Sequence, residues 1–291
     1  MRVLVLGSQG QLGNCLSDVL KCSEFEISYK SRKEIDISNF QKTKNQIFKL
    51  NPEVIINASA YTKVDDAEEN YLDAFMINHL AVSNIASICF DIDCWLIHIS
   101  TDYVFDGQSN IPYKESSHTN PQSIYGRSKL DGENAIIKSG CNYIIIRTAW
   151  VFSEYGNNFA KTMLRLANDN EELRVISDQI GCPTYAIDIA YAIEKILNKI
   201  KLKNCSSNIY NYCGDIPCSW HHFAVSIFKE AKKFGFRTPQ IIYSVESATY
   251  ETKASRPKYS VLDCSKILHD FEIYPSNWRN GIKKMLSELD K

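Results

Sequence analysis

The sequence predicts an α/β protein built on a doubly wound parallel sheet, followed by a smaller C-terminal α/β domain. Three observations support this prediction. Apolar segments of strand length alternate with amphipathic segments over the first 150 residues, a glycine-rich turn follows the first apolar segment, and the pattern loosens later. Strands that are buried on both faces and separated by helices form parallel sheets covered on both sides. Right-handed crossovers make such sheets doubly wound.

The expected elements follow in chain order. The strands of the first half are nearly continuous apolar runs at 2–6, 26–29, 53–57, 95–100 and 143–147, and the helices between them cover 11–21, 39–50, 71–90 and 122–139. In the second half we expect helices at 157–169, 185–199, 219–234 and 278–289, with strands at 173–177 and 208–212. No low-complexity linker separates the halves. We therefore expect residues 151–291 to pack on residues 1–150, and an exchange of segments between them stays open.

Composition and charge narrow the class of protein. The 291 residues are 44% hydrophobic and 23% charged, with a formal net charge of −1, so we expect no nucleic-acid or membrane partner. The ten cysteines are scattered without a CxxC pair, and the first apolar run is too short for a signal peptide or a membrane span. We expect a reduced, cytoplasmic protein. The spacing of Cys213, Cys218, His221 and His222 fits no zinc pattern.

A glycine-rich turn predicts a dinucleotide site. It directly follows the first strand, opens a helix, and contributes Gly7, Gln9, Gly10, Gln11, Leu12 and Gly13. Glycines in this context permit a tight turn, close approach of a pyrophosphate and close packing of helix on strand. The helix N-terminus adds unpaired N–H groups that suit an anion. We interpret the first domain as a Rossmann-type NAD(P)-binding domain.

The end of the second strand bears on the choice of cofactor. A free ribose 2′-hydroxyl favours an acidic residue about 20 residues after the glycines. This chain instead carries Lys30, Arg32 and Lys33 there, with no carboxylate before Glu34. The sequence therefore favours NADPH, with NADH also accepted, and Arg32 as the reader of a 2′-phosphate. Further cofactor contacts are expected after the second and third strands, at Asp36, Ile37, Ala58, Ser59, Ala60 and Tyr61.

Tyr125 and Lys129 predict proton chemistry. Four positions apart, they lie on one side of a helix, and a nearby cation lowers the pKa of a phenol. A tyrosine tuned in this way can exchange a proton with a carbonyl or an alcohol. Thr101, at the end of the fourth strand, could hold the reacting oxygen. The matching hydride must come from a cofactor.

Together these motifs resemble the extended short-chain dehydrogenase/reductase superfamily and, within it, the dTDP-4-dehydrorhamnose reductase family. The resemblance runs nearly end to end, through segments 10–13, 57–65, 100–107, 125–133, 147–151, 158–164, 178–184 and 256–257. It implies reduction of the C4 ketone of dTDP-4-dehydro-6-deoxy-L-mannose (dTDP-4-dehydrorhamnose) to dTDP-L-rhamnose by NAD(P)H. The second domain would then bind the sugar nucleotide.

The resemblance also implies roles for individual residues. Thr101, Tyr125 and Lys129 would form the catalytic set, with Tyr125 as proton donor and with Tyr125 and Lys129 also touching the cofactor. The residues expected to contact the sugar nucleotide are Thr101, Asp102, Tyr103, Trp150 and Asn158. Some members of the family carry an acidic residue for a magnesium-linked dimer contact where this chain has Cys15, a poor ligand for Mg²⁺. We therefore expect no metal, and either a monomer or a homodimer.

Other functions are compatible with such a fold to different degrees. A 4,6-dehydratase would need a glutamate after Asp102, where this chain has Tyr103. Another nucleotide-sugar 4-ketoreductase, or an epimerase, remains an alternative because the same three residues suffice for it. A non-catalytic subunit such as the β subunit of methionine adenosyltransferase also shares the resemblance, although it would not need Tyr125.

Overall fold

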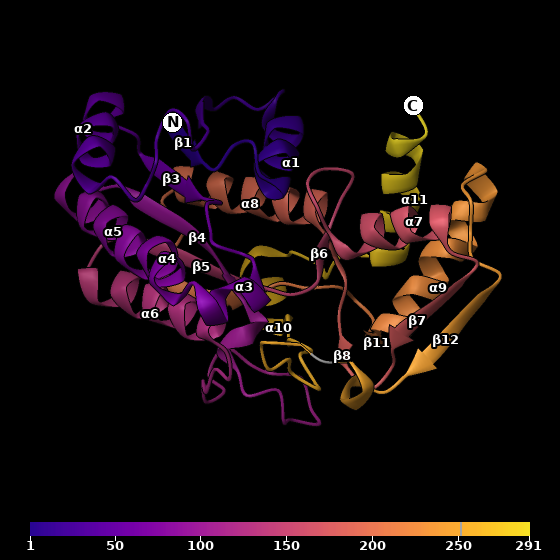
Figure 1. Ribbon diagram of the computed structural model, residues 1–291. Coiled ribbons are helices and arrows are strands. Elements are labelled where there is room, and N and C mark those ends of the chain that lie inside the picture. The colour runs from indigo at the N-terminus through magenta and orange to yellow at the C-terminus, as the bar shows by residue number, and fades with distance from the viewer. Residues whose placement is uncertain (251) are drawn as a thin grey trace.

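The computed structural model describes residues 1–250 and 252–291. Its centre is a six-stranded, fully parallel sheet in the order β10-β5-β4-β3-β1-β2. Four of these strands, β1, β3, β4 and β5, are labelled in Figure 1. The strands are β1 (Arg2–Leu6), β2 (Glu26–Lys30), β3 (Val54–Asn57), β4 (Trp95–Thr101), β5 (Tyr143–Thr148) and β10 (Asn208–Asn211). The predicted doubly wound α/β fold is confirmed. Each of the five strands expected in the first half is present.

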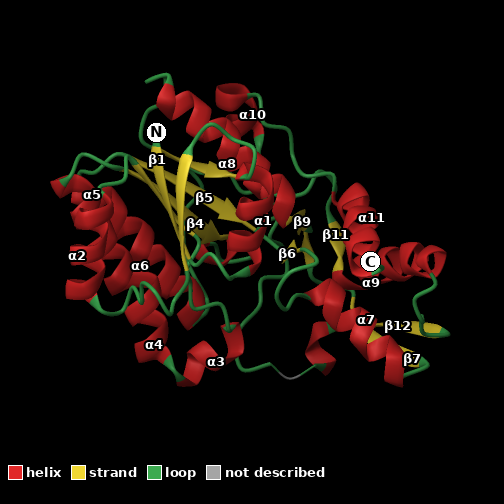
Figure 2. Cartoon of the chain, turned by 90° about the horizontal axis from the view of Figure 1, so that it is seen from above, coloured by secondary structure: helices red, strands yellow, loops and turns green. Residues whose placement is uncertain are grey.

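Helices cover both faces of this sheet (Figure 2). One face packs against α1 (Gln11–Leu20), α8 (Ala186–Lys201) and α10 (Ser265–Phe271), and its core includes Val5, Ile97 and Ile193. The other face packs against α2 (Phe40–Leu50), α5 (Ala81–Asp91) and α6 (Ile124–Ser139), around Leu6, Ile55 and Ile85. Burial on both faces explains why the strands are continuously apolar instead of alternating.

The helix expected over 71–90 is interrupted. It consists of α4 (Tyr71–Phe75), a π-helical turn (Met76–Leu80) and α5. Among the described residues, Tyr71–Asp91 is the one helical segment with the length and hydropathy of a membrane span. Its side chains Ala81, Val82, Ile85 and Ala86 are buried against the sheet, which is the position of a core helix.

The rest of the chain forms a smaller α/β part. Its parallel pair β7 (Glu172–Ile176) and β12 (Ile241–Val245) packs with α7 (Phe159–Asp169) and α9 (Trp220–Ala231), next to α11 (Trp278–Leu289). There are two further short strand pairs in the described chain: β6 (Val151–Phe152) with β9 (Thr184–Tyr185), and β8 (Ile180–Gly181) with β11 (Cys218–Ser219). Phe152, Phe223 and Trp278 are fully buried between these elements.

Segments from beyond residue 150 complete the first sheet. Strand β10 pairs in parallel with β5, while α8 packs against α1 and α10 packs against β10 and α8. Conversely, the short helix α3 (Val64–Glu69), which follows β3, faces the C-terminal part across a cavity. The carboxyl ends of the parallel strands therefore meet the smaller part, where ligands of such folds bind.

Candidate active site

The glycine turn between β1 and α1 packs tightly against neighbouring backbone. Gly7 has φ +80° and donates its N–H to Lys30 O at 3.0 Å. A Cβ on Gly7 would lie 2.8 Å from Ser59 Oγ, and a Cβ on Gly13 would overlap Gly7 O and Ser8. Gly10 caps α1 without a side-chain hydrogen bond, so the first-turn N–H groups stay available. The structure thus places the turn of β1 directly beside the loop after β3.

The predicted residues around β2 have different environments. Arg32 is 81% exposed, and its Nε lies 3.6 Å from Asp36 Oδ2. Asp36 also accepts hydrogen bonds from Ser38, which hold the pKa of its carboxyl below the usual value although burial opposes them. Ile37 is buried in the core against the sheet. Arg32 and Asp36 are therefore accessible to a ligand, whereas the side chain of Ile37 supports the loop from beneath.

The loop after β3 is held by two asparagines. Asn57 Oδ1 accepts from Ser59 N at 3.1 Å. Asn78, on the π-helical turn, accepts from Tyr61 N at 2.9 Å and donates to Tyr61 O and to Ser128 Oγ. These bonds fix the backbone at residues 58–61, where the sequence predicted cofactor contacts. Asn78 was not predicted, although a polar residue within an apolar helix is a signal for such a role.

Thr101 and Tyr125 meet at the carboxyl end of β4. Thr101 Oγ1 donates to Asp102 Oδ1 at 3.0 Å and accepts from Tyr103 N at 3.2 Å. Burial raises the pKa of Tyr125 to about 12, although a hydrogen bond with Thr101 works in the opposite direction. Tyr103 packs its ring edge against Tyr125, with ring centres 5.5 Å apart. Burial also raises the pKa of Asp102 to about 6.

The ammonium group of Lys129 contacts strand β4. Its Nζ donates to Ile99 O at 2.6 Å and lies 3.1 Å from His98 Nε2. Burial lowers the pKa of Lys129 to about 8, against the influence of Glu133. The sequence predicted a phenol whose pKa is lowered toward neutral, whereas the net pKa of Tyr125 is raised. Burial dominates the phenol, and the ammonium group is directed toward β4.

Trp150 is held in a strained conformation. It has φ +50°, which is rare for a bulky residue, and its ring stacks on Trp220 with centres 3.4 Å apart. A Cβ on Gly181 would lie 2.5 Å from the Trp150 ring, so this position needs glycine. The partner Trp220 was not predicted, because its helix α9 gives an ordinary amphipathic pattern.

Asn158 contacts other protein groups. Its Oδ1 caps α7 by accepting from Lys161 N, and its Nδ2 donates to Gln11 Oε1 at 2.8 Å and to Ser153 O at 2.7 Å. The structure therefore connects Asn158 to the glycine turn. Its polar atoms are used within the protein instead of being directed toward Trp150.

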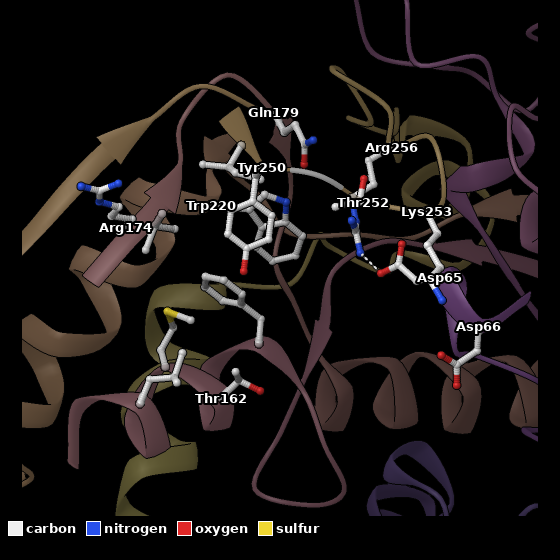
Figure 3. A pocket seen from close by; sticks show the side chains of 15 residues that line it. Asp65, Asp66, Thr162, Arg174, Gln179, Trp220, Tyr250, Thr252, Lys253 and Arg256 are labelled. Atoms are coloured by element: carbon white, nitrogen blue, oxygen red, sulfur yellow. Dashed lines mark hydrogen bonds and ion pairs between the residues drawn. The ribbon is translucent and has the colours of Figure 1, made fainter. Parts of the chain in front are cut away.

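A cavity of about 630 Å³ separates the two parts of the chain. Figure 3 shows Arg256 bonded to Asp65 of α3 across one side, at 2.6 Å, with Trp220 and Tyr250 at the centre. Aromatic, apolar, cationic and acidic side chains share its wall. The lining residues are Asp65, Asp66, Phe159, Thr162, Met163, Leu166, Arg174, Val175, Ile176, Gln179, Trp220, Tyr250, Thr252, Lys253 and Arg256.

Comparison with known proteins decides the family. The family model described as the RmlD substrate binding domain matches residues 1–291. The chain belongs to this family. A curated RmlD-type relative, the dTDP-4-dehydrorhamnose reductase of Aggregatibacter actinomycetemcomitans, is 40% identical over 288 residues, covering 98% of each chain.

Two solved structures extend the likeness within the RmlD family. A dTDP-4-dehydrorhamnose reductase from Clostridium acetobutylicum has a TM-score of 0.92 at 34% identity and covers 100% of both chains. The same enzyme from Bacillus anthracis, solved in complex with NADP, has a TM-score of 0.90 at 35% identity and covers 99% of both chains. Both the sheet and the smaller part of this chain are therefore common to the family.

Proposed function

We propose that this protein is a dTDP-4-dehydrorhamnose reductase, which reduces the C4 ketone of its dTDP-sugar to give dTDP-L-rhamnose. The observation that carries the proposal is the meeting of Thr101 and Tyr125 at the carboxyl end of β4. Relatives that match this chain along its full length bear the name of that enzyme. NADPH is the proposed hydride donor, with NADH as a second donor.

The residues around the glycine turn fit such a cofactor, which supplies the hydride when it is bound. Gly7 and Gly13 let the turn pack closely on Ser59 and Ser8, and the open N-terminus of α1 suits a pyrophosphate. Arg32 is exposed and would face a 2′-phosphate. Ser59 and Lys129 would lie along the nicotinamide ribose. The relative from Bacillus anthracis, crystallised with NADP, supports this assignment.

Tyr125 would supply the proton. A phenol with a pKa of about 12 keeps its proton at neutral pH and gives it up only to a strong base, such as the alkoxide that develops on the sugar oxygen. C4 gains the hydride, O4 gains the proton of Tyr125, and the phenolate recovers a proton from solvent. Thr101 would hold O4 in place. The charge on Lys129 would favour the phenolate while it exists.

The cavity beside α3 is the proposed place of the nucleotide part of the substrate. Its volume of about 630 Å³ is in the range of ligand pockets. Trp220 and Tyr250 offer faces for a base, and Lys253 and Arg256 offer positive charge for a diphosphate. Asp102, Tyr103 and Trp150 would contact the sugar closer to Tyr125.

The net charge and the free cysteines of the chain bear on its partners and its location. We propose a cytoplasmic monomer or homodimer that binds a small-molecule dTDP-sugar and neither nucleic acid nor membrane. The formal net charge is −1, and the ten cysteines, all within the described part of the chain, are free thiols.

The test is to mix the protein with NADPH and dTDP-4-dehydrorhamnose and to follow the absorbance of the reduced nicotinamide. We expect NADPH to be consumed in a one-to-one ratio with dTDP-L-rhamnose. Conversion of the sugar without consumption of NADPH would indicate an epimerase. Binding of NADPH with no turnover would indicate a non-catalytic subunit, and either result would remove the proposed function.

A further inference from the structure

A buried line of polar side chains runs from the loop after β3 to Lys129. Ser59 N donates to Asn57 Oδ1 at 3.1 Å, Asn57 Nδ2 lies 3.2 Å from His98 Nδ1, and His98 Nε2 lies 3.1 Å from Lys129 Nζ. Asn57, His98 and Lys129 are each at most 1% exposed. The parallel register of β3 and β4 pairs Asn57 with His98, so the sheet itself places these two side chains in contact.

The direction of each hydrogen bond in this line can be assigned. The Ser59 N–H can only donate, so the amide oxygen of Asn57 faces Ser59 and its NH₂ group faces His98. His98 Nδ1 therefore accepts. A neutral imidazole carries one proton, which must then lie on Nε2 and point at Lys129. An ammonium group has no lone pair to accept it. The line is satisfied when Lys129 is an uncharged amine that accepts from His98 and donates to Ile99 O.

A charged Lys129 requires the opposite arrangement. His98 stays neutral, because burial and the neighbouring Lys129 hold its pKa well below the usual value. To accept from an ammonium group, His98 must move its proton from Nε2 to Nδ1. The Asn57 amide must then turn its oxygen toward His98, which breaks the bond with Ser59 N–H. The loss of the Ser59 hydrogen bond disfavours this arrangement, so the line opposes the charging of Lys129.

We propose that His98 is a positioning residue for Lys129 and that its ring changes tautomer when Lys129 gains or loses its proton. Asn57 carries this change to Ser59, in the loop that packs on Gly7 of the glycine turn. The consequence for catalysis rests on the proposed function. The tautomer change itself is a property of the folded protein and does not depend on a substrate.

Lys129 has three other polar neighbours to consider. Glu133 of α6 favours the ammonium form, and its carboxylate is held by Arg147 of β5 through Nε and Nη2 and by Ser100 of β4. Tyr125, one turn earlier on α6, has a raised pKa and stays neutral. Asn57 of β3 carries no charge. His98 is therefore the neighbour whose proton can move when Lys129 titrates.

Nitrogen-15 NMR of the histidine rings tests this in the full-length protein without substrate, since the two neutral tautomers and the imidazolium ion give distinct spectra. The His98 signals are identified by their loss in His98→Gln or, if that variant does not fold, by elimination with variants of the other five histidines. Between about pH 6 and about pH 10, we expect a neutral ring that changes from Nδ1–H to Nε2–H as Lys129 loses its proton. One tautomer throughout, or an imidazolium ion, overturns the proposal.

The variant Asn57→Asp provides a second test of the proposal. A carboxylate can only accept, so it keeps His98 in the Nδ1–H form, and the tautomer change should disappear. The alkaline limb of the pH profile of kcat/KM should move upward by about one pH unit. His222→Gln, at an exposed position of α9, is the matched control and should leave both readouts as they are. A tautomer change that persists in Asn57→Asp contradicts the coupling. The NMR measurement needs no turnover. It therefore still tests the tautomer change if the protein proves not to be a reductase.

Discussion

Tyr125 is the residue on which the proposed chemistry depends. Replacing it with phenylalanine removes the proton donor and leaves the ring that packs against Tyr103. We expect kcat to fall by about 10²–10⁴-fold, with the dissociation constant of NADPH nearly unchanged. Steady-state kinetics and fluorescence titration measure the two quantities. Tyr191→Phe, exposed on α8, is the control, and equal turnover in both variants would remove Tyr125 from the mechanism.

The charge of Lys129 predicts a pH dependence. Burial lowers its pKa to about 8, so the ammonium group is lost as the pH rises through this value. If the charge supports the phenolate of Tyr125, kcat/KM should decline above about pH 8. The unfolded chain holds this proton up to a higher pH, so the contribution of Lys129 to the free energy of unfolding should increase between the two pKa values. A profile of kcat/KM that stays flat to about pH 10 contradicts the role of Lys129.

Arg32 tests the choice of cofactor. It is exposed and paired only loosely with Asp36, so its removal should cost little stability. Arg32→Ala should weaken NADPH much more than NADH, because only NADPH carries the 2′-phosphate. Isothermal titration with both cofactors measures this, with Lys33→Ala as the neighbouring control. Equal losses for the two cofactors would show that Arg32 does not contact the 2′-phosphate.

At the scale of elements, the glycine turn after β1 packs against the loop after β3. Gly7→Ala places a methyl group 2.8 Å from Ser59 Oγ at a backbone with φ +80°. We expect NADPH affinity to fall by at least about 10-fold and stability to drop by about 1–3 kcal/mol. Gly235→Ala is the matched control, because φ is +76° there and nothing lies within 4 Å of the added Cβ. If both variants bind NADPH equally, the close approach at Gly7 has no role.

The sequence predicted elements well where one physical cause dominated. Strands β3 and β4 are buried on both faces, as Ile55 and Ile97 show, and such continuous apolar runs predict a parallel sheet. Strand β12 was missed because Ile241 and Tyr243 are exposed, so its apolar residues show no buried face. The break of the helix at Met76–Leu80 was also missed. In this segment the backbone of Asn78 lies close against Gly132 of α6, a contact that no local pattern contains.

The candidate site was predictable only in part for the same reason. Thr101, Tyr125 and the glycine turn are recognisable from local motifs. The contacts of Lys129 with His98 and Ile99 join separate elements, and the burial that raises the pKa of Tyr125 appears only in the folded protein, so no local motif contains either. Trp220 was missed because its stacking on Trp150 joins two distant segments.

At the scale of the whole molecule, the two parts depend on each other. Strand β10 completes the sheet beside β5, and α8 covers the core against α1. A fragment of residues 1–150 would lose both and expose residues such as Ile144 and Ile146. We expect this fragment to show no cooperative thermal transition, whereas the full chain unfolds in one. Circular dichroism measures both, and a cooperative transition in the fragment would establish an independent domain ending near residue 150.

The transfer of hydride to C4 is the central claim, and isotope labelling tests it most directly. The full-length protein is given NADPH that carries deuterium at the nicotinamide C4, together with dTDP-4-dehydrorhamnose, and the product is examined by NMR and mass spectrometry. With a label present on the transferred face of the ring, we predict one deuterium at C4 of dTDP-L-rhamnose. The experiment is run with each of the two faces of the nicotinamide ring labelled in turn. If neither gives deuterium at C4 of the product, or if deuterium appears at another carbon, the account is contradicted.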